Sequence, residues 1–274
     1  MARWSDGIYD SDEALDFYTT ITDRLERELA YWLSPENIQY HSRWVLEVIS
    51  LVEVLLLCDR HKHGNEDYVF PEKSVKRWRD IFMTVWDADW NVEETDKTQR
   101  LPYNEQAFRE KYRSTVVQLF DYLRDKASFL EHDVLSQETK IPAIPLPMFS
   151  KHKWKNEFGQ SKVRTSQVVD DLIKHLEQVV IYYHSSEKWT FAISYGMEEA
   201  WAAVDLLGFL CAAYEKTPGL YPQTVNAYRK LAIQNSETSN EVHGQWDENR
   251  PFFRNVSKAY DMLEAVAKRY KPNY

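Results

Sequence analysis

Four carboxylates lie within the two most apolar segments of the chain. They form two pairs with the same spacing, Glu47 with Glu53 and Glu199 with Asp205. Residues six apart diverge by about 120° around a helix, so one member of each pair can face inward while the other faces solvent. A buried carboxylate must be ion-paired, hydrogen-bonded, metal-bound or protonated. These four residues are therefore the first candidates for chemistry.

Two interpretations of these acids are open. The first is a metal site, but helical di-iron proteins combine such carboxylates with Glu-x-x-His, which this sequence does not contain. The second is that arginines of neighbouring helices neutralise them, and Arg79 and Arg229 stand at matching places in the two halves. We favour the second interpretation, and we expect neither a metal nor a cofactor.

Other patterns offer little chemistry. His61 and His63 could bind zinc from a turn, but no second pair of ligands stands at a recognised spacing. The sequence contains no G-x-S-x-G, no Walker loop and no G-x-G-x-x-G motif. These observations favour a protein that is not an enzyme.

Aromatic residues are abundant, with 10 Trp, 17 Tyr and 12 Phe. Tryptophans in or beside loops need not belong to the core, so they are candidate anchors for a protein partner. The candidates of this kind are Trp86, Trp90, Trp154 and Trp246.

The formal charge of −9 disfavours general binding of nucleic acid, because an acidic surface repels phosphates. The best local exception is the basic stretch 151–164, which contains Lys151, Lys153, Lys155, Lys162 and Arg164. A solvated linker is the interpretation that we favour for it.

The segment VLEVISLVEVLLLC (45–58) contains two Glu and is shorter than the roughly 20 residues that a membrane-spanning helix needs. The two cysteines, Cys58 and Cys211, lie in apolar surroundings and are expected to be buried thiols in a reducing compartment. No secretory signal is evident at the start. We expect a cytoplasmic protein without a membrane segment.

Helical periodicity dominates the chain, and no run with strand alternation is evident. Ser34-Pro35-Glu36 has the composition of a helix start, and Pro71-Glu72 is a second such signal. We expect an all-α fold of about eight helices in a bundle. The expected helices are 12–31, 35–60, a third opening at Pro71-Glu72, 105–127, 163–183, 196–216, 222–235 and 250–270.

The chain divides into an N-terminal half (1–140), a Pro-rich connector (141–162) and a C-terminal half (163–274), although one compact domain is an alternative. Placing Glu47 on Glu199 also places Glu53 on Asp205, and the segment ending at Arg79 aligns with that ending at Arg229. This indicates two diverged three-helix repeats around a pseudo-two-fold, with a groove between the halves. The alternative is that any two amphipathic helical stretches align this well with chosen gaps.

The opening WSDGIYDSDEALDF (4–17) permits a turn at Gly7, a helix cap at Asp10 or Ser11, and aromatic residues that fold back over the first helical turn. Alternatively, Asp10, Asp12 and Asp16 bind a cation or a basic partner.

The same stretch resembles the start of a family of small bacterial domains of uncharacterised function, whose pattern is Trp-Gly-x-Gly-x-aromatic-acidic-x-Asp-x-Ala-x-Asp. Ser5 replaces the first Gly of the pattern. The matching residues are Trp4, Gly7, Tyr9, Asp10, Asp12, Ala14 and Asp16. The resemblance implies no mechanism.

The leading functional hypothesis is a non-enzymatic protein-interaction module, a subunit or inhibitor in a bacterial defence or toxin–immunity system, with a protein partner or a second copy of itself. One alternative is a helical enzyme or ligand binder that uses the four carboxylates in the groove between the halves. The other is a nucleic-acid-associated subunit that uses the stretch 151–164.

Overall fold

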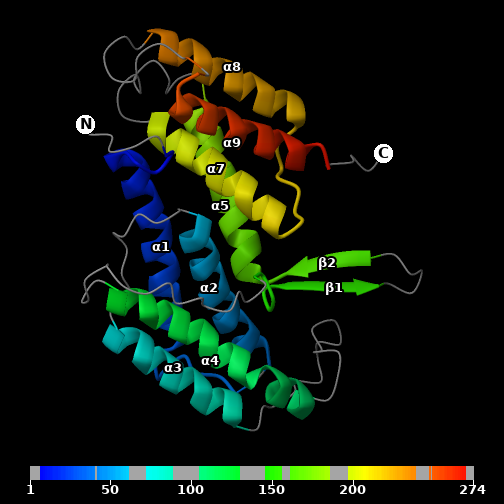
Figure 1. Cartoon of the computed structure of the whole chain (residues 1–274). Coiled ribbons are helices and arrows are strands. Elements are labelled where there is room, and N and C mark those ends of the chain that lie inside the picture. Colours follow the sequence, from blue (N-terminus) through cyan, green and yellow to red (C-terminus); the bar gives the residue numbers. More distant parts are fainter. Residues whose placement is uncertain are drawn as a thin grey trace. The chain divides into compact units, whose positions relative to one another are not determined.

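The structure is a computed structural model of the chain, and it describes residues 7–40, 42–61, 72–88, 105–129, 146–155, 161–185, 197–238, 247 and 249–269. Within these residues the fold is all-α, with eight helices and one two-stranded hairpin (Figure 1). The elements are α1 (Asp12–Trp32), α2 (Ser42–His61), α3 (Glu72–Asp87), α4 (Glu105–Phe129), β1 (Lys151–Lys155), β2 (Ser161–Thr165), α5 (Gln167–Tyr183), α7 (Met197–Ala213), α8 (Pro222–Thr238) and α9 (Pro251–Ala267). None of these helices is long and apolar enough to cross a membrane.

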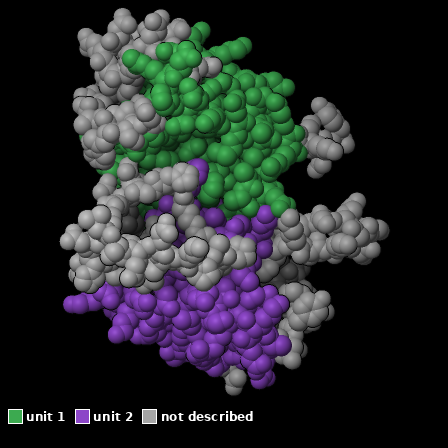
Figure 2. Space-filling model, viewed as in Figure 1, with its two compact units in different colours: residues 1–22, 170–274 green, residues 23–169 purple. Residues whose placement is uncertain are grey.

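The chain folds into two compact units (Figure 2). Unit 1 contains residues 1–22 and 170–274, and unit 2 contains residues 23–169. These boundaries differ from the predicted halves at 140 and 163. The first residues of the chain belong with the C-terminal helices, and the connector belongs with the N-terminal ones.

Unit 2 is built around α2, which is buried on almost all sides, as its apolar sequence predicts. Helices α3 and α4 pack against it and against each other. Phe82 on α3 lies at the centre of an aromatic cluster, 6.0 Å from Trp44, 5.9 Å from Trp86 and 5.3 Å from Phe120 between ring centroids. Aromatic pairs at such distances stabilise a core beyond the area that they bury.

Unit 1 is built in a similar way around α7, which is buried from Met197 to Gly208 except at Glu199. Helix α9 packs along it and in turn contacts α8. A side chain at Gly208 would place its Cβ 3.2 Å from the backbone nitrogen of Leu263, so glycine permits the close approach of α7 and α9.

Two predicted helix starts are wrong. Ser34-Pro35-Glu36 does not open a helix, because the Ser34 hydroxyl and the Asn37 amide both donate to the carbonyl of Tyr31 and so close the end of α1. Residues 163–165, the first three of the predicted fifth helix, instead belong to strand β2 (161–165), which pairs antiparallel with β1 (151–155). Helix α5 therefore begins at Gln167 rather than at 163.

Candidate functional site

Glu53 is the most deeply buried of the predicted acids. Its Oε1 accepts hydrogen bonds from the backbone N–H of Met148 at 2.7 Å and of Phe149 at 3.0 Å. Its Oε2 accepts from Phe149 at 2.9 Å and from Ser150 at 2.7 Å. Burial raises the pKa of Glu53, and the four N–H contacts oppose that rise by stabilising the charged form. This carboxylate fixes residues 148–150 to α2.

Glu47, on the same helix, faces the first residues of α5. It lies 3.4 Å from the backbone nitrogen of Gln167, and the N–H of Val168 also contributes to its environment. Burial raises the pKa of Glu47, while these N–H groups and Arg43 lower it. A carboxylate in this place compensates the free N–H groups at a helix N-terminus.

Asp205 on α7 plays the part in unit 1 that Glu53 plays in unit 2. The hydroxyl of Tyr9 donates to its Oδ2 at 3.0 Å and reaches the carbonyl of Ala202 at 3.3 Å. Tyr9 is buried and packs edge-on against Tyr18, with ring centroids 5.5 Å apart. In each unit, therefore, the second acid of the central helix holds the segment just before another element. Glu53 holds residues 148–150 before β1, and Asp205 holds Tyr9 before α1.

The first turn of α7 carries two further acids. Glu199 accepts a hydrogen bond from the hydroxyl of Tyr183, and this contact together with burial raises the pKa of Tyr183. Glu198 is buried and lies in hydrogen-bond contact with Glu13 of α1. Burial raises the pKa of Glu13, and the Glu198 carboxylate raises it further.

The predicted arginine partners bind other acids. Arg79 pairs with Asp121 at 2.8 Å and with Asp80 at 3.5 Å, and Arg229 pairs with Asp261 at 2.6 Å. The prediction that Arg79 and Arg229 neutralise the four acids is therefore wrong. The two ion pairs nevertheless correspond, since each joins the Pro-started helix of its unit to the following helix, and this correspondence supports the predicted repeat.

The four predicted acids form hydrogen bonds within the fold. Backbone N–H groups engage Glu47 and Glu53, while tyrosine hydroxyls engage Glu199 and Asp205. Such contacts fix each carboxylate in one orientation. Over the described part of the chain, no group of three or more His, Cys, Asp or Glu side chains is placed to hold a metal ion.

Comparisons of the chain with family models, curated proteins and solved structures find no match.

The four tryptophan candidates have different outcomes. Trp86 is buried in the aromatic cluster of unit 2, so it is a core residue and cannot anchor a partner at the surface. Trp90 and Trp246 lie outside the described residues. Trp154 lies in β1, opposite Lys162 of β2, but its side chain is not described.

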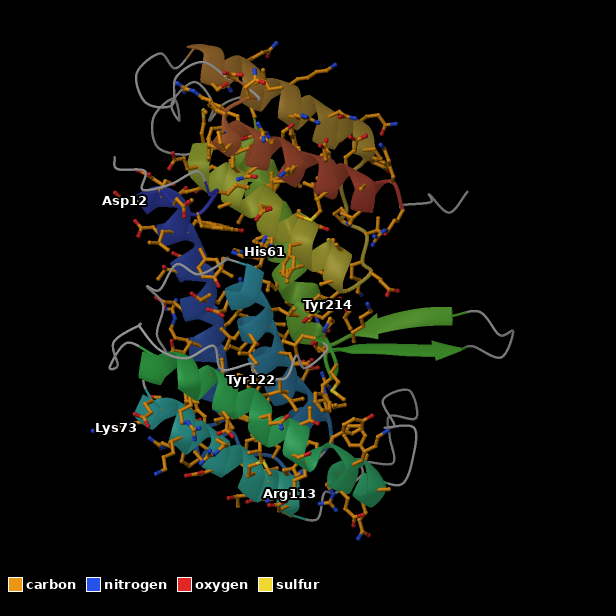
Figure 3. All side chains as sticks on the ribbon, viewed as in Figure 1. Asp12, His61, Lys73, Arg113, Tyr122 and Tyr214 are labelled. Atoms are coloured by element: carbon orange, nitrogen blue, oxygen red, sulfur yellow. The ribbon has the colours of Figure 1, made fainter. Side chains whose placement is uncertain are left out.

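The other sequence candidates also find places in the fold. His61 is the last residue of α2 (Figure 3), and His63 lies outside the described residues. The basic stretch forms the β1–β2 hairpin, with Lys151 paired to Thr165 and Lys155 to Ser161. Cys58 and Cys211 are buried thiols, as predicted.

The opening stretch begins a helix and anchors it. The N–H of Gly7 donates to the carboxylate of Asp10, and the Ser11 hydroxyl accepts from the N–H of Ala14 as the helix cap. Asp12 is exposed in the first turn of α1 (Figure 3). The stretch is thus a cap and an anchor through Tyr9; Trp4 lies outside the described residues.

Several residues of interest were not predicted from the sequence. Glu177 accepts from the N–H of Gly219 at 2.6 Å and holds the turn before α8. The Glu13–Glu198 contact and the large exposed side chains of Tyr31 and Tyr40 were also missed. Periodicity places Glu13 and Glu177 on helices, but a contact between two distant acids leaves no local signal.

We expect Tyr9→Phe to lower the free energy of unfolding of unit 1 by about 1–3 kcal/mol, because it leaves the buried Asp205 without its hydroxyl donor. Hydrogen exchange of α7 peptides measures the change. The matched control is Tyr221→Phe at an exposed position, which we expect to change exchange by less than about twofold. Equal exchange in Tyr9→Phe and wild type would show that the anchor is not needed.

Proposed function

We propose that the protein is a non-enzymatic interaction module that binds a protein partner or a second copy of itself. The observation that carries the proposal is the turn 31–40 of unit 2, here called the aromatic turn. It presents Tyr31 with 61% and Tyr40 with 46% of the residue surface exposed. Most large aromatic side chains of the described residues are, by contrast, buried.

The aromatic turn is held in shape by its own polar groups. The Ser34 hydroxyl donates to the carbonyl of Tyr31 at 2.8 Å, and the Asn37 amide donates to the same carbonyl and to Ser34 Oγ at 2.9 Å each. The rings of Tyr31 and Trp32 meet edge to face at 6.1 Å. A surface that is ordered before binding loses less conformational entropy on binding, and tyrosine is a preferred residue in such surfaces.

The formal charge of −9 favours a basic partner through electrostatic attraction. Together with the resemblance of residues 4–17 to a bacterial domain family, this supports a cytoplasmic subunit or inhibitor in a bacterial defence or toxin–immunity system. An inhibitor of this kind would cover a basic functional surface of its partner.

The test is complex formation with the products of neighbouring genes, measured by light scattering and titration calorimetry. We expect a defined complex or a homo-oligomer, and at least a tenfold weaker affinity for Tyr31→Ala with Tyr40→Ala, or about 1.4 kcal/mol. The matched control is Tyr221→Ala, an exposed tyrosine of unit 1, which should leave the affinity within twofold. A monomer that binds none of these proteins, or a double variant with unchanged affinity, would contradict the proposal.

A further inference from the structure

His184 stands directly after α5 and is buried, with 4% of its surface exposed. Its Nδ1 lies 2.7 Å from the carbonyl oxygen of Val180, and its Nε2 lies 2.7 Å from the hydroxyl of Tyr260 on α9. Its ring stacks on Tyr228 of α8 at 4.5 Å between centroids. The imidazole therefore joins the end of α5 to both α8 and α9 within unit 1.

These contacts define the state of the imidazole. A carbonyl oxygen only accepts, so Nδ1 carries the hydrogen and donates to Val180. In the neutral ring Nε2 is then the acceptor, and the Tyr260 hydroxyl donates to it. A second proton on Nε2 would face this donor and force the hydroxyl to turn away. Burial accordingly lowers the pKa of His184 to about 4, although the Val180 carbonyl opposes this effect.

The charged groups on the packed helices have partners of their own. The titratable groups in contact with the ring are Tyr228 on α8 and Tyr260 on α9. Their charged neighbours along the chain are Arg229 and Asp261, while Tyr183 precedes His184 and is hydrogen-bonded to Glu199 of α7. Asp261 pairs with Arg229 at 2.6 Å, and Glu199 accepts from Tyr183. Both acids are thus engaged elsewhere.

We propose that His184 is an acid-sensitive latch of unit 1, which holds α5 to α8 and α9 while its ring is neutral and releases them when the ring takes up a proton. Since the pKa in the folded state lies below the ordinary 6.5, the stabilisation is complete above pH 6.5. It is lost progressively as the pH falls from 6.5 to about 4. Glu13 and Glu177 of unit 1 have raised pKa values and change stability in the opposite direction.

The first test is nitrogen NMR of the imidazoles in the full chain. We expect one of the eight histidines to hold its proton on Nδ1 and to titrate near pH 4. Its resonance should vanish in His184→Gln and shift in Tyr260→Phe, which keeps the ring and removes the donor. A His184 ring protonated on Nε2, or one that titrates near pH 6.5, would overturn the proposal.

The second test is hydrogen exchange by mass spectrometry at pH 7.5 and pH 4, corrected for intrinsic rates. Wild-type α8 and α9 peptides should lose about 100-fold more protection on acidification than those of His184→Gln, as a shift from 6.5 to about 4 requires. Peptides of α3 and α4 in unit 2 are the internal control and should respond equally in both proteins. If α8 and α9 also lost the same protection in wild type and in His184→Gln, the proposed latch would be refuted.

Discussion

Glu53→Ala is expected to lower the free energy of unfolding of unit 2 by about 3–5 kcal/mol. The substitution removes the acceptor of the N–H groups of residues 148–150, of which Phe149 and Ser150 are buried, so these groups lose a compensating oxygen. Phe149 also loses its fixed position against Phe108 and Tyr112. Hydrogen exchange of peptides from α2 and α4, together with denaturant unfolding, measures the loss.

The matched control for Glu53→Ala is Glu110→Ala on α4, where the carboxylate is exposed and accepts a hydrogen bond from the exposed Gln106. We expect this control to change stability by less than about 0.5 kcal/mol. Glu53→Gln should fall between the two, because an amide keeps one acceptor oxygen but points its NH₂ group at N–H donors. If the free energy of unfolding of Glu53→Ala lay within about 1 kcal/mol of wild type, as for the control, the role assigned to Glu53 would be refuted.

Trp86→Ala should lower the free energy of unfolding of unit 2 by about 3–5 kcal/mol, since it leaves a cavity in the aromatic cluster. Trp86 is in contact with Phe82 and Phe108, at centroid distances of 5.9 and 6.1 Å. Tryptophan fluorescence and near-ultraviolet circular dichroism during denaturant unfolding provide the measurement.

Replacing the buried Trp86 should lower stability, whereas replacing the exposed Tyr31 should weaken partner binding. Tyr31→Ala, the control for Trp86→Ala, is expected to leave stability within about 0.5 kcal/mol while it weakens partner binding. Trp86→Phe should retain part of the stability that Trp86→Ala loses, because a phenyl ring fills more of the cavity than a methyl group does. If Trp86→Ala instead left stability unchanged and abolished binding, the surface role first predicted for this residue would be restored.

Helices were predictable where local chemistry decides them. Pro71-Glu72 marks the start of α3, and Pro222 and Pro251 stand first in α8 and α9, because proline fits the first helical turn. The same rule was misleading at Ser34-Pro35. There the side chains of Ser34 and Asn37 bind the carbonyl of Tyr31 at the end of the preceding helix. Only the three-dimensional course of the chain shows which helix such side chains cap.

The acids of the candidate site were predictable, but their partners were not. The helical spacing predicts that one member of each pair faces inward without saying which, and the structure shows Glu53 and Asp205 buried. Arginine was the predicted partner, because a charged side chain is visible in the sequence. The donors found are the backbone N–H groups of 148–150 and the hydroxyl of Tyr9, nearly 200 residues from Asp205 along the chain. A backbone amide is present at nearly every position, so it gives no signal.

The division into units also determines which unit can fold first during translation. Unit 2 is one continuous stretch, 23–169, and its contacts can form while the rest is still being translated. Unit 1 requires residues from both sides of that stretch, so Tyr9 leaves the ribosome long before Asp205 exists. Residues 12–22 of α1 are thus made early and anchored late, so their apolar side chains stay uncovered until unit 1 is complete.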